Sequence, residues 1–141
     1  MKKPKIISGG YVKDKRGLVY FNNNFKFINI KRFYIVQNYK KDFIRAWHGH
    51  LNEEKYIFCV QGKAKIGAVK ISNVKNPSKK KKPLFFELDS SKPDIIFIPA
   101  GYANASKSLD RKMKLVIFSN LTLKQSIRDD YRYPEDYWKF I

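Results

Sequence analysis

The sequence has little of what marks a secreted, membrane-spanning or cysteine-clustered metal protein. It contains one cysteine, Cys59, in 141 residues, which excludes a disulfide within the chain and any site built from several cysteines. A single free thiol suits a reducing compartment, so a cytoplasmic location is expected. The basic start, Met1–Lys5, leads into no apolar stretch of the signal-peptide kind. No window approaches the roughly 20 apolar residues of a membrane span, so we expect a soluble chain without a membrane partner.

Acidic residues are also scarce. Asp and Glu number 12 against 30 Lys and Arg, a formal net charge of +18, which favours nucleic acid, anionic lipid or a phosphorylated small molecule as partner. Nucleic-acid-binding barrels interleave exposed aromatic and basic residues on one face. Phe33–Tyr34 beside Lys31–Arg32 is a weak local instance of this pattern, while most aromatic residues alternate as core residues do. We therefore expect no nucleic-acid partner.

Helical periodicity is nearly absent, and short strands take its place. Hydrophobic residues make up 43% and aromatic residues 16% of the chain, enough for the core of a single domain, 1–141. The many short apolar runs between turn residues predict an all-β sandwich or barrel. The expected strands are Leu18–Phe21, Phe27–Gln37, Ile44–His50, Tyr56–Gln61, Ala64–Ile71, Leu84–Leu88, Ile95–Ile98 and Lys114–Phe118. Thr122–Tyr131 is the best helical segment, and Asn76–Pro83 is expected to be a mobile, solvated loop.

The chain has only two histidines, His48 and His50, and they lie on one expected strand. Residues two apart on a strand share a face, with Cα atoms about 6.5–7 Å apart. Arg45 would lie on the opposite face unless a bulge intervenes. Two adjacent imidazoles inside a barrel can ligate a metal, transfer protons or pack as hydrogen-bonded core residues, and the spacing alone leaves all three open.

Two motifs resemble those of the cupins. His48-Gly-His50, followed at the right spacing by Glu54 and Gly62, is similar to the first cupin motif, and Pro99–Asn104 is similar to the second. The resemblance implies a jelly-roll β-barrel with a short C-terminal helical or irregular segment. Metal-binding cupins usually carry a histidine ligand where the second motif of this chain ends in Asn, and a neutral amide is a poorer ligand for transition metals than imidazole. We therefore expect no metal and no cofactor.

Six motifs in matching order resemble the dTDP-4-dehydrorhamnose 3,5-epimerase family within the cupins. They are Asp14–Gly17, Gln37–Asn38, Arg45–His48, Lys55–Gly62, Ile98–Asn104, and Asp129–Asp130 with Trp138 beyond them. The resemblance implies an epimerase-like isomerase that removes a proton next to the ketone of a nucleotide-activated, dTDP-linked 4-keto-6-deoxy sugar. Such an enzyme would serve the synthesis of bacterial surface polysaccharides.

The same resemblance implies roles for individual residues. His48 would be the general base, with Asp129 or Asp130 bonded to its second ring nitrogen, and Lys55 would stabilise the enolate oxygen. Contacts to phosphate or to the rest of the substrate are expected from Arg16, Arg32, Gln37, Arg45, Tyr102 and Asn104. The family also implies a homodimer, in which Arg16 would serve the site of the partner.

The main departure from that family concerns the general acid that would protonate the sugar on the face opposite the base. The late strand that carries a tyrosine in the family, here Lys114–Asn120, has none. A tyrosine elsewhere would have to take its place, the candidates being Tyr34, Tyr39, Tyr102 and Tyr131.

Two alternatives follow from this departure. Ile30–Tyr34 and Arg45–His50 resemble the dTDP-4-keto-6-deoxyglucose 3,4-ketoisomerases, in which paired histidines would carry a proton between adjacent carbons. A cupin that binds a sugar nucleotide without catalysis is the other alternative. The sequence favours the epimerase, and His50 separates the two enzymes: it only packs in an epimerase and carries the proton in a ketoisomerase.

Overall fold

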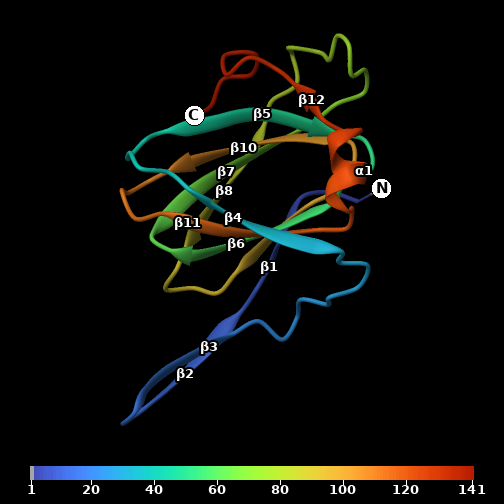
Figure 1. Cartoon of the computed structure of the whole chain (residues 1–141). Helices are drawn as coiled ribbons and strands as arrows, with labels where there is room; N and C mark the ends of the chain where they lie inside the picture. Colours follow the sequence, from blue (N-terminus) through green and yellow to red (C-terminus); the bar gives the residue numbers. More distant parts are fainter. Residues whose placement is uncertain (1) are drawn as a thin grey trace.

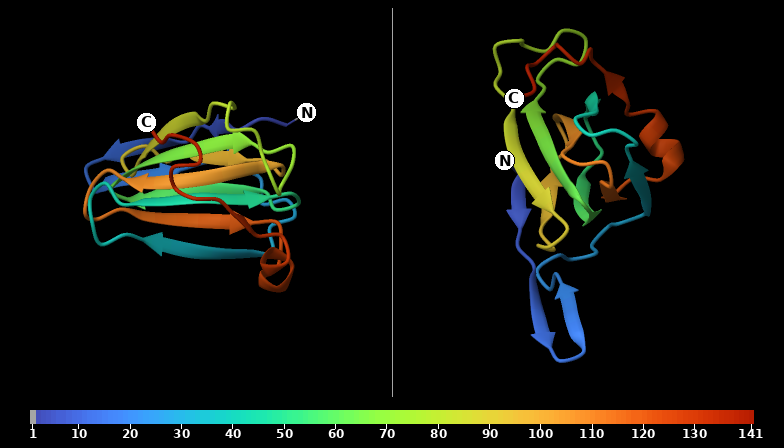
Figure 2. Two further views of the ribbon diagram at one scale, coloured as in Figure 1. Left: turned by 90° about the horizontal axis from the view of Figure 1, so that it is seen from above. Right: turned by 90° about the vertical axis from the view of Figure 1, so that its left-hand side faces the viewer.

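Two five-stranded antiparallel sheets face each other in the computed structural model, which describes residues 2–141 (Figure 1). The first, called the β4 sheet, has the order β1 (Lys5–Ile7), β9 (Ile95–Ile98), β6 (Lys55–Gln61), β11 (Lys114–Ser119) and β4 (Arg32–Gln37). The second, called the β5 sheet, has the order β12 (Tyr131–Arg132), β5 (Ile44–His50), β10 (Tyr102–Ser108), β7 (Lys63–Lys70) and β8 (Leu84–Asp89). The views of Figure 2 show the two layers stacked on each other, and the expected cupin jelly roll is confirmed.

The main core lies between the two layers. Alternate residues of each strand point inward, and Ile66, Leu88, Ile96 and Leu115 are among those that are almost fully buried. A second cluster forms where the C-terminal segment packs on the β5 sheet, with Trp47 against Trp138 at a ring-centroid distance of 5.5 Å. Packing on both faces holds β5 in place, and β5 carries both histidines.

A separate two-stranded hairpin, β2 (Gly10–Asp14) and β3 (Gly17–Phe21), projects away from the barrel (Figure 1). A short helix, α1 (Leu123–Ile127), begins with a capping box formed by Thr122 and Gln125. Within residues 2–141 no helix is long and apolar enough to cross a membrane.

Each of the eight expected strands overlaps an observed strand, with one large boundary error. Phe27–Lys31 is irregular, and Asn29 there has a φ of 60°, a left-handed conformation that interrupts an extended chain. Strands β1, β2, β10 and β12 were not predicted. The sequence of β10, Tyr-Ala-Asn-Ala-Ser-Lys-Ser, is composed mainly of small and polar residues, so it lacks the β-branched and aromatic signal.

The lysine-rich loop between β7 and β8 is anchored by its backbone rather than free. Tyr133 donates a hydrogen bond to the carbonyl of Val74, Tyr137 to that of Pro77, and Trp138 to that of Ser78. The backbone of the loop is therefore held at these carbonyls, while its lysine side chains are exposed and Lys79 lies over the Tyr137 ring at 4.8 Å.

Candidate functional site

A pocket of about 350 Å³ opens between the two sheets beside α1. Eight of the twelve residues expected from the sequence line it: Arg32, Tyr34, Arg45, His48, His50, Lys55, Asn104 and Asp130. Arg32 and Tyr34 come from β4 and Lys55 from β6, whereas both histidines come from β5 in the opposite sheet. The fold thus brings together residues that lie up to 98 positions apart in the sequence, from Arg32 to Asp130.

A register shift in β5 explains how Arg45 reaches the pocket together with the histidines. Asn104 of β10 pairs with His48, whereas Ser106, two residues further along β10, pairs with Arg45, three residues earlier on β5. Between these two pairs β5 therefore has one residue more than β10. One extra residue reverses the side to which a strand residue points. The bulge left open by the sequence is therefore present. The Arg45 guanidinium is held by the Asn38 side chain, with Nε 2.7 Å from Oδ1.

His50 is fixed at one ring nitrogen and unpaired at the other. Its Nδ1 lies 2.7 Å from the backbone carbonyl of Asp129, and a carbonyl only accepts, so Nδ1 carries the hydrogen. Nε2 is then the basic nitrogen, and it is buried without a hydrogen-bond partner. Burial lowers the pKa of His50, as does the Lys55 ammonium, while the Asp129 carbonyl and Glu53 oppose that shift. A neutral ring with a free basic nitrogen is suited to accepting a proton.

His48 lies on the same face and is less buried than His50. Its pKa falls to about 4, first because burial disfavours the charged ring, and then because Arg132 and Lys55 repel it. The negative charge of Asp130 raises the pKa of His48 and so offsets part of this shift. Arg132 in turn pairs with Asp130, with Nε 3.0 Å from Oδ1. His48 is therefore neutral at neutral pH, next to an anion that can stabilise its protonated form.

A buried carboxylate that was not predicted from the sequence, Glu53, lies beside Lys55. The side chain of Glu53 accepts a hydrogen bond from Ser119 at 2.6 Å and contacts Arg32 at 3.3 Å and Lys55 at 3.6 Å. The resemblance to the first cupin motif drew attention to the next residue, Glu54. No pattern in the sequence separates the two glutamates, because the loop after β5 decides which one turns inward.

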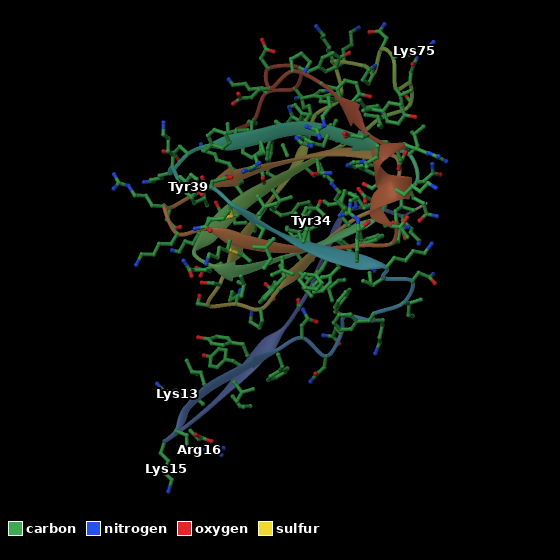
Figure 3. All side chains as sticks on the ribbon, in the orientation of Figure 1. Lys13, Lys15, Arg16, Tyr34, Tyr39 and Lys75 are labelled. Atoms are coloured by element: carbon green, nitrogen blue, oxygen red, sulfur yellow. The ribbon has the colours of Figure 1, made fainter. Side chains whose placement is uncertain are left out.

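Four expected site residues lie outside the pocket lining. The Asp129 carboxylate accepts hydrogen bonds from the backbone N–H groups of three consecutive residues, Leu51 to Glu53, so it holds a loop and does not orient His48. Tyr102 belongs to the core between the sheets. The exposed side chain of Gln37 belongs to the outward-facing set of β4. Arg16 lies at the tip of the hairpin, where it pairs with Asp14 at 2.7 Å (Figure 3).

The side chains that would complete a metal site are directed elsewhere. Glu54 pairs with Lys2 at 3.1 Å, and the Asn104 amide donates to the backbone carbonyl of His48 at 3.2 Å. Across residues 2–141 no three side chains of His, Cys, Asp or Glu are grouped in a way that could hold a metal ion.

Comparison with known families assigns the chain. Residues 2–141 match the family described as FdtA: WxcM-like, C-terminal. The chain belongs to this family. No protein of curated function matches its sequence.

Solved structures of sugar-nucleotide enzymes share the fold. The sugar 3,4-ketoisomerase QdtA from Thermoanaerobacterium thermosaccharolyticum, in complex with TDP, is 19% identical with a TM-score of 0.69, covering 95% of this chain and 90% of that one. A dTDP-4-dehydrorhamnose 3,5-epimerase from Sulfolobus tokodaii is 19% identical with a TM-score of 0.77, at 97% and 80% coverage. The 3'-monoepimerase ChmJ from Streptomyces bikiniensis, in complex with dTDP-quinovose, is 15% identical with a TM-score of 0.75, at 94% and 71% coverage.

Proposed function

We propose that this FdtA-family cupin is a 3,4-ketoisomerase acting on a dTDP-linked 4-keto-6-deoxy sugar. The observation that carries the proposal is the pair of neutral histidines on one wall of the pocket, with the Nε2 of His50 unpaired. Moving a ketone to the neighbouring carbon requires a proton to leave one carbon and arrive at the next. Two bases on one face of the pocket suit that transfer. A protein that only binds a sugar nucleotide would not need them.

The chemistry follows from the residues present. A C–H bond next to a ketone is acidified, and a neutral imidazole can remove its proton at neutral pH. His50 accepts the proton at Nε2, and the ammonium of Lys55 stabilises the negative charge that forms on the ketone oxygen. The protonated His50 then returns its proton to that oxygen, which gives a neutral enediol. His48 takes the proton of the neighbouring hydroxyl and delivers it to the adjacent carbon from the same side, which leaves the ketone at the first carbon. Asp130 stabilises the positive charge on His48 while that ring is protonated.

The anionic end of the substrate fits the charge around the pocket. Arg45 and Arg132 line it, and guanidinium groups bind phosphate through paired hydrogen bonds. Arg32 is less available, because it contacts Glu53 and Ser126 and lies over the Tyr34 ring at 4.8 Å. Nucleotide complexes of the solved relatives QdtA and ChmJ, with TDP and dTDP-quinovose, support a dTDP-linked substrate.

Epimerisation is the second candidate, and Tyr34 is the observation in its favour. Tyr34 points into the pocket from the β4 sheet, across from the histidines (Figure 3), where a phenol could protonate the opposite face of a sugar. On β11, the strand expected to supply this acid, the residue that lines the pocket is Ile117, which has no proton to donate. The acid is therefore missing from the strand that carries it in the epimerases, and we rank ketoisomerisation first.

Proton NMR in D2O with dTDP-4-keto-6-deoxyglucose tests the proposal. A 3-keto product with deuterium at the carbon that has become the alcohol supports ketoisomerisation. Deuterium at C3 and C5 with retention of the 4-keto group supports epimerisation instead. Tight binding of dTDP without any exchange would leave only a binding function.

The pH dependence of kcat/KM should show histidines that stay neutral in mildly acidic solution. The pKa of His48 is about 4 and that of His50 lies below its ordinary value, so both rings keep the base form as pH falls through 6.5. The rate should therefore stay level through pH 6.5 and drop only at lower pH. The unfolded chain binds that proton more readily, so stability increases from pH 4 to 6.5 and folding must be checked by circular dichroism at each pH. A rate that halves near pH 6.5 would contradict this assignment.

We also propose that the chain forms a homodimer through the projecting hairpin. Tyr11, Val12, Val19 and Tyr20 are 45–59% exposed on it, and a lone two-stranded hairpin is marginally stable in water. Light scattering should give twice the 16.7 kDa of one chain, and replacing Val12 and Val19 together by lysine should give the monomer. A wild-type monomer at micromolar concentration would refute the dimer. In such a dimer Arg16 would reach the site of the partner, as the family resemblance implies.

A further inference from the structure

Glu53 occupies an unusual place among the charged side chains of the pocket. It lies in the short connection between β5 and β6 and is 2% exposed. Its backbone N–H is held by the Asp129 carboxylate at 2.8 Å, and its Oε2 is held by the Ser119 hydroxyl at 2.6 Å. The residue is thus fixed at both ends, at the backbone and at one carboxylate oxygen.

The second oxygen of Glu53 faces the reacting groups. Oε1 lies 3.5 Å from Nδ1 of His50 and 3.6 Å from Nζ of Lys55. His50 comes from the β5 sheet and Lys55 from the β4 sheet, so one carboxylate oxygen is close to a functional group on each wall. Burial raises the pKa of Glu53, but the Lys55 ammonium, the Ser119 hydroxyl and His50 together bring it below its ordinary value, so the carboxylate stays charged.

Stability alone does not explain this arrangement. Burying a carboxylate with its cations carries a desolvation cost, and well-packed apolar residues of similar volume are often as stable or more so. A buried charge that contacts both a base and a cation in a pocket instead points to a role in the reaction.

We propose that Glu53 is a positioning residue that fixes Lys55 and His50 relative to each other across the pocket. This inference rests on the proposed function. Lys55 is held where its ammonium can meet the ketone oxygen, since a free lysine chain would sample many rotamers. His50 gains a negative neighbour that stabilises its ring once the proton has arrived at Nε2. Glu53 itself touches no substrate and transfers no proton.

The chain offers a matched pair of variants for the test. Glu53→Gln keeps the shape and the Ser119 hydrogen bond but removes the charge, whereas Glu54→Gln makes the same change at the adjacent residue, which pairs with the exposed Lys2. Because the chain has only two histidines, ¹⁵N-histidine NMR can follow His50 without substrate. Its charged or titratable neighbours are Lys55 on β6, Glu53 in the connecting loop, Asp129 and Asp130 after α1, and His48 on its own strand.

In Glu53→Gln we expect the midpoint of His50 titration to move to lower pH, because the negative neighbour is gone, with Nδ1 still protonated against Asp129. Glu54→Gln should titrate as the wild type does. Deuterium exchange should slow by about 10²-fold in Glu53→Gln, the loss typical of a misplaced catalytic group, with dTDP affinity unchanged. Ser119→Ala removes the 2.6 Å hydrogen bond to Oε2 and leaves the 3.3 Å contact with Arg32. It should move both measurements in the same direction by less, and it serves if Glu53→Gln does not fold.

An unchanged His50 titration in Glu53→Gln would overturn the inference, whatever happens to activity. So would equal loss of exchange in Glu53→Gln and Glu54→Gln, because a general effect of lost charge would then explain both. If the wild-type chain exchanges no substrate proton, the proposed function fails by itself, and the titrations still decide whether Glu53 controls His50.

Discussion

Replacing His50 by asparagine should slow deuterium exchange into the keto sugar by about 10²–10⁴-fold, the usual contribution of a general base. The amide can still donate to the Asp129 carbonyl, as Nδ1 of the imidazole does at 2.7 Å, so the local fold should persist. It cannot accept a proton in the way that Nε2 can. Binding of dTDP, measured by calorimetry, should be unchanged, because His50 lies deep in the pocket and is not expected to touch phosphate.

The comparison with His48→Asn makes this prediction specific. If His50 removes the first proton and His48 supplies the second, His48→Asn should stop product formation but still allow exchange at the first carbon. His50→Asn should stop both. Exchange at the wild-type rate in His50→Asn would show that the base is wrongly assigned, and the sequence-based choice of His48 as the base would then take its place.

The fold could be predicted because its signals are local. Runs such as Ile95–Ile98 and Ile44–His50 combine β-branched or aromatic residues with clear turn residues on either side, and these strands form where expected. The strand Tyr102–Ser108 was missed because its stability comes from its place in the sheet. It pairs on both sides, with β5 and β7, and small residues suffice there.

The site could be predicted only in part, and there are physical reasons why the other residues were not predicted. The family motifs brought out residues that line the pocket, such as His48 and Lys55. The inward turn of Glu53 depends on a loop held by a residue 76 positions later in the chain, Asp129, and no local pattern encodes that contact. The inward position of Arg45 depends on a bulge opposite β10. Long-range geometry therefore decides which of several charged residues enter the pocket.

The two neighbouring acids Asp129 and Asp130 provide the sharpest contrast between stability and activity. The Asp129 carboxylate receives three backbone N–H groups, and an asparagine there can offer only one oxygen. Asp129→Asn should leave at least one buried N–H group unpaired and lower the free energy of unfolding by about 3 kcal/mol, or Tm by about 10 °C. The backbone carbonyl that holds His50 is unchanged, and the oxygen of the new asparagine can still accept the N–H of Glu53, so the folded variant should stay active at low temperature.

Asp130→Asn should instead lower activity and leave stability nearly unchanged. Its pairing with Arg132 is partly exposed, and such pairs contribute within about 1 kcal/mol, so thermal unfolding should change little. The anion that raises the pKa of His48 is lost, so product formation should slow by at least about 10-fold, and the His48 titration should move to lower pH. Thermal unfolding by circular dichroism and turnover in the same buffer measure both effects. If Asp129→Asn were the inactive variant and Asp130→Asn the unstable one, the assignment of Asp129 to the loop and Asp130 to His48 would be reversed.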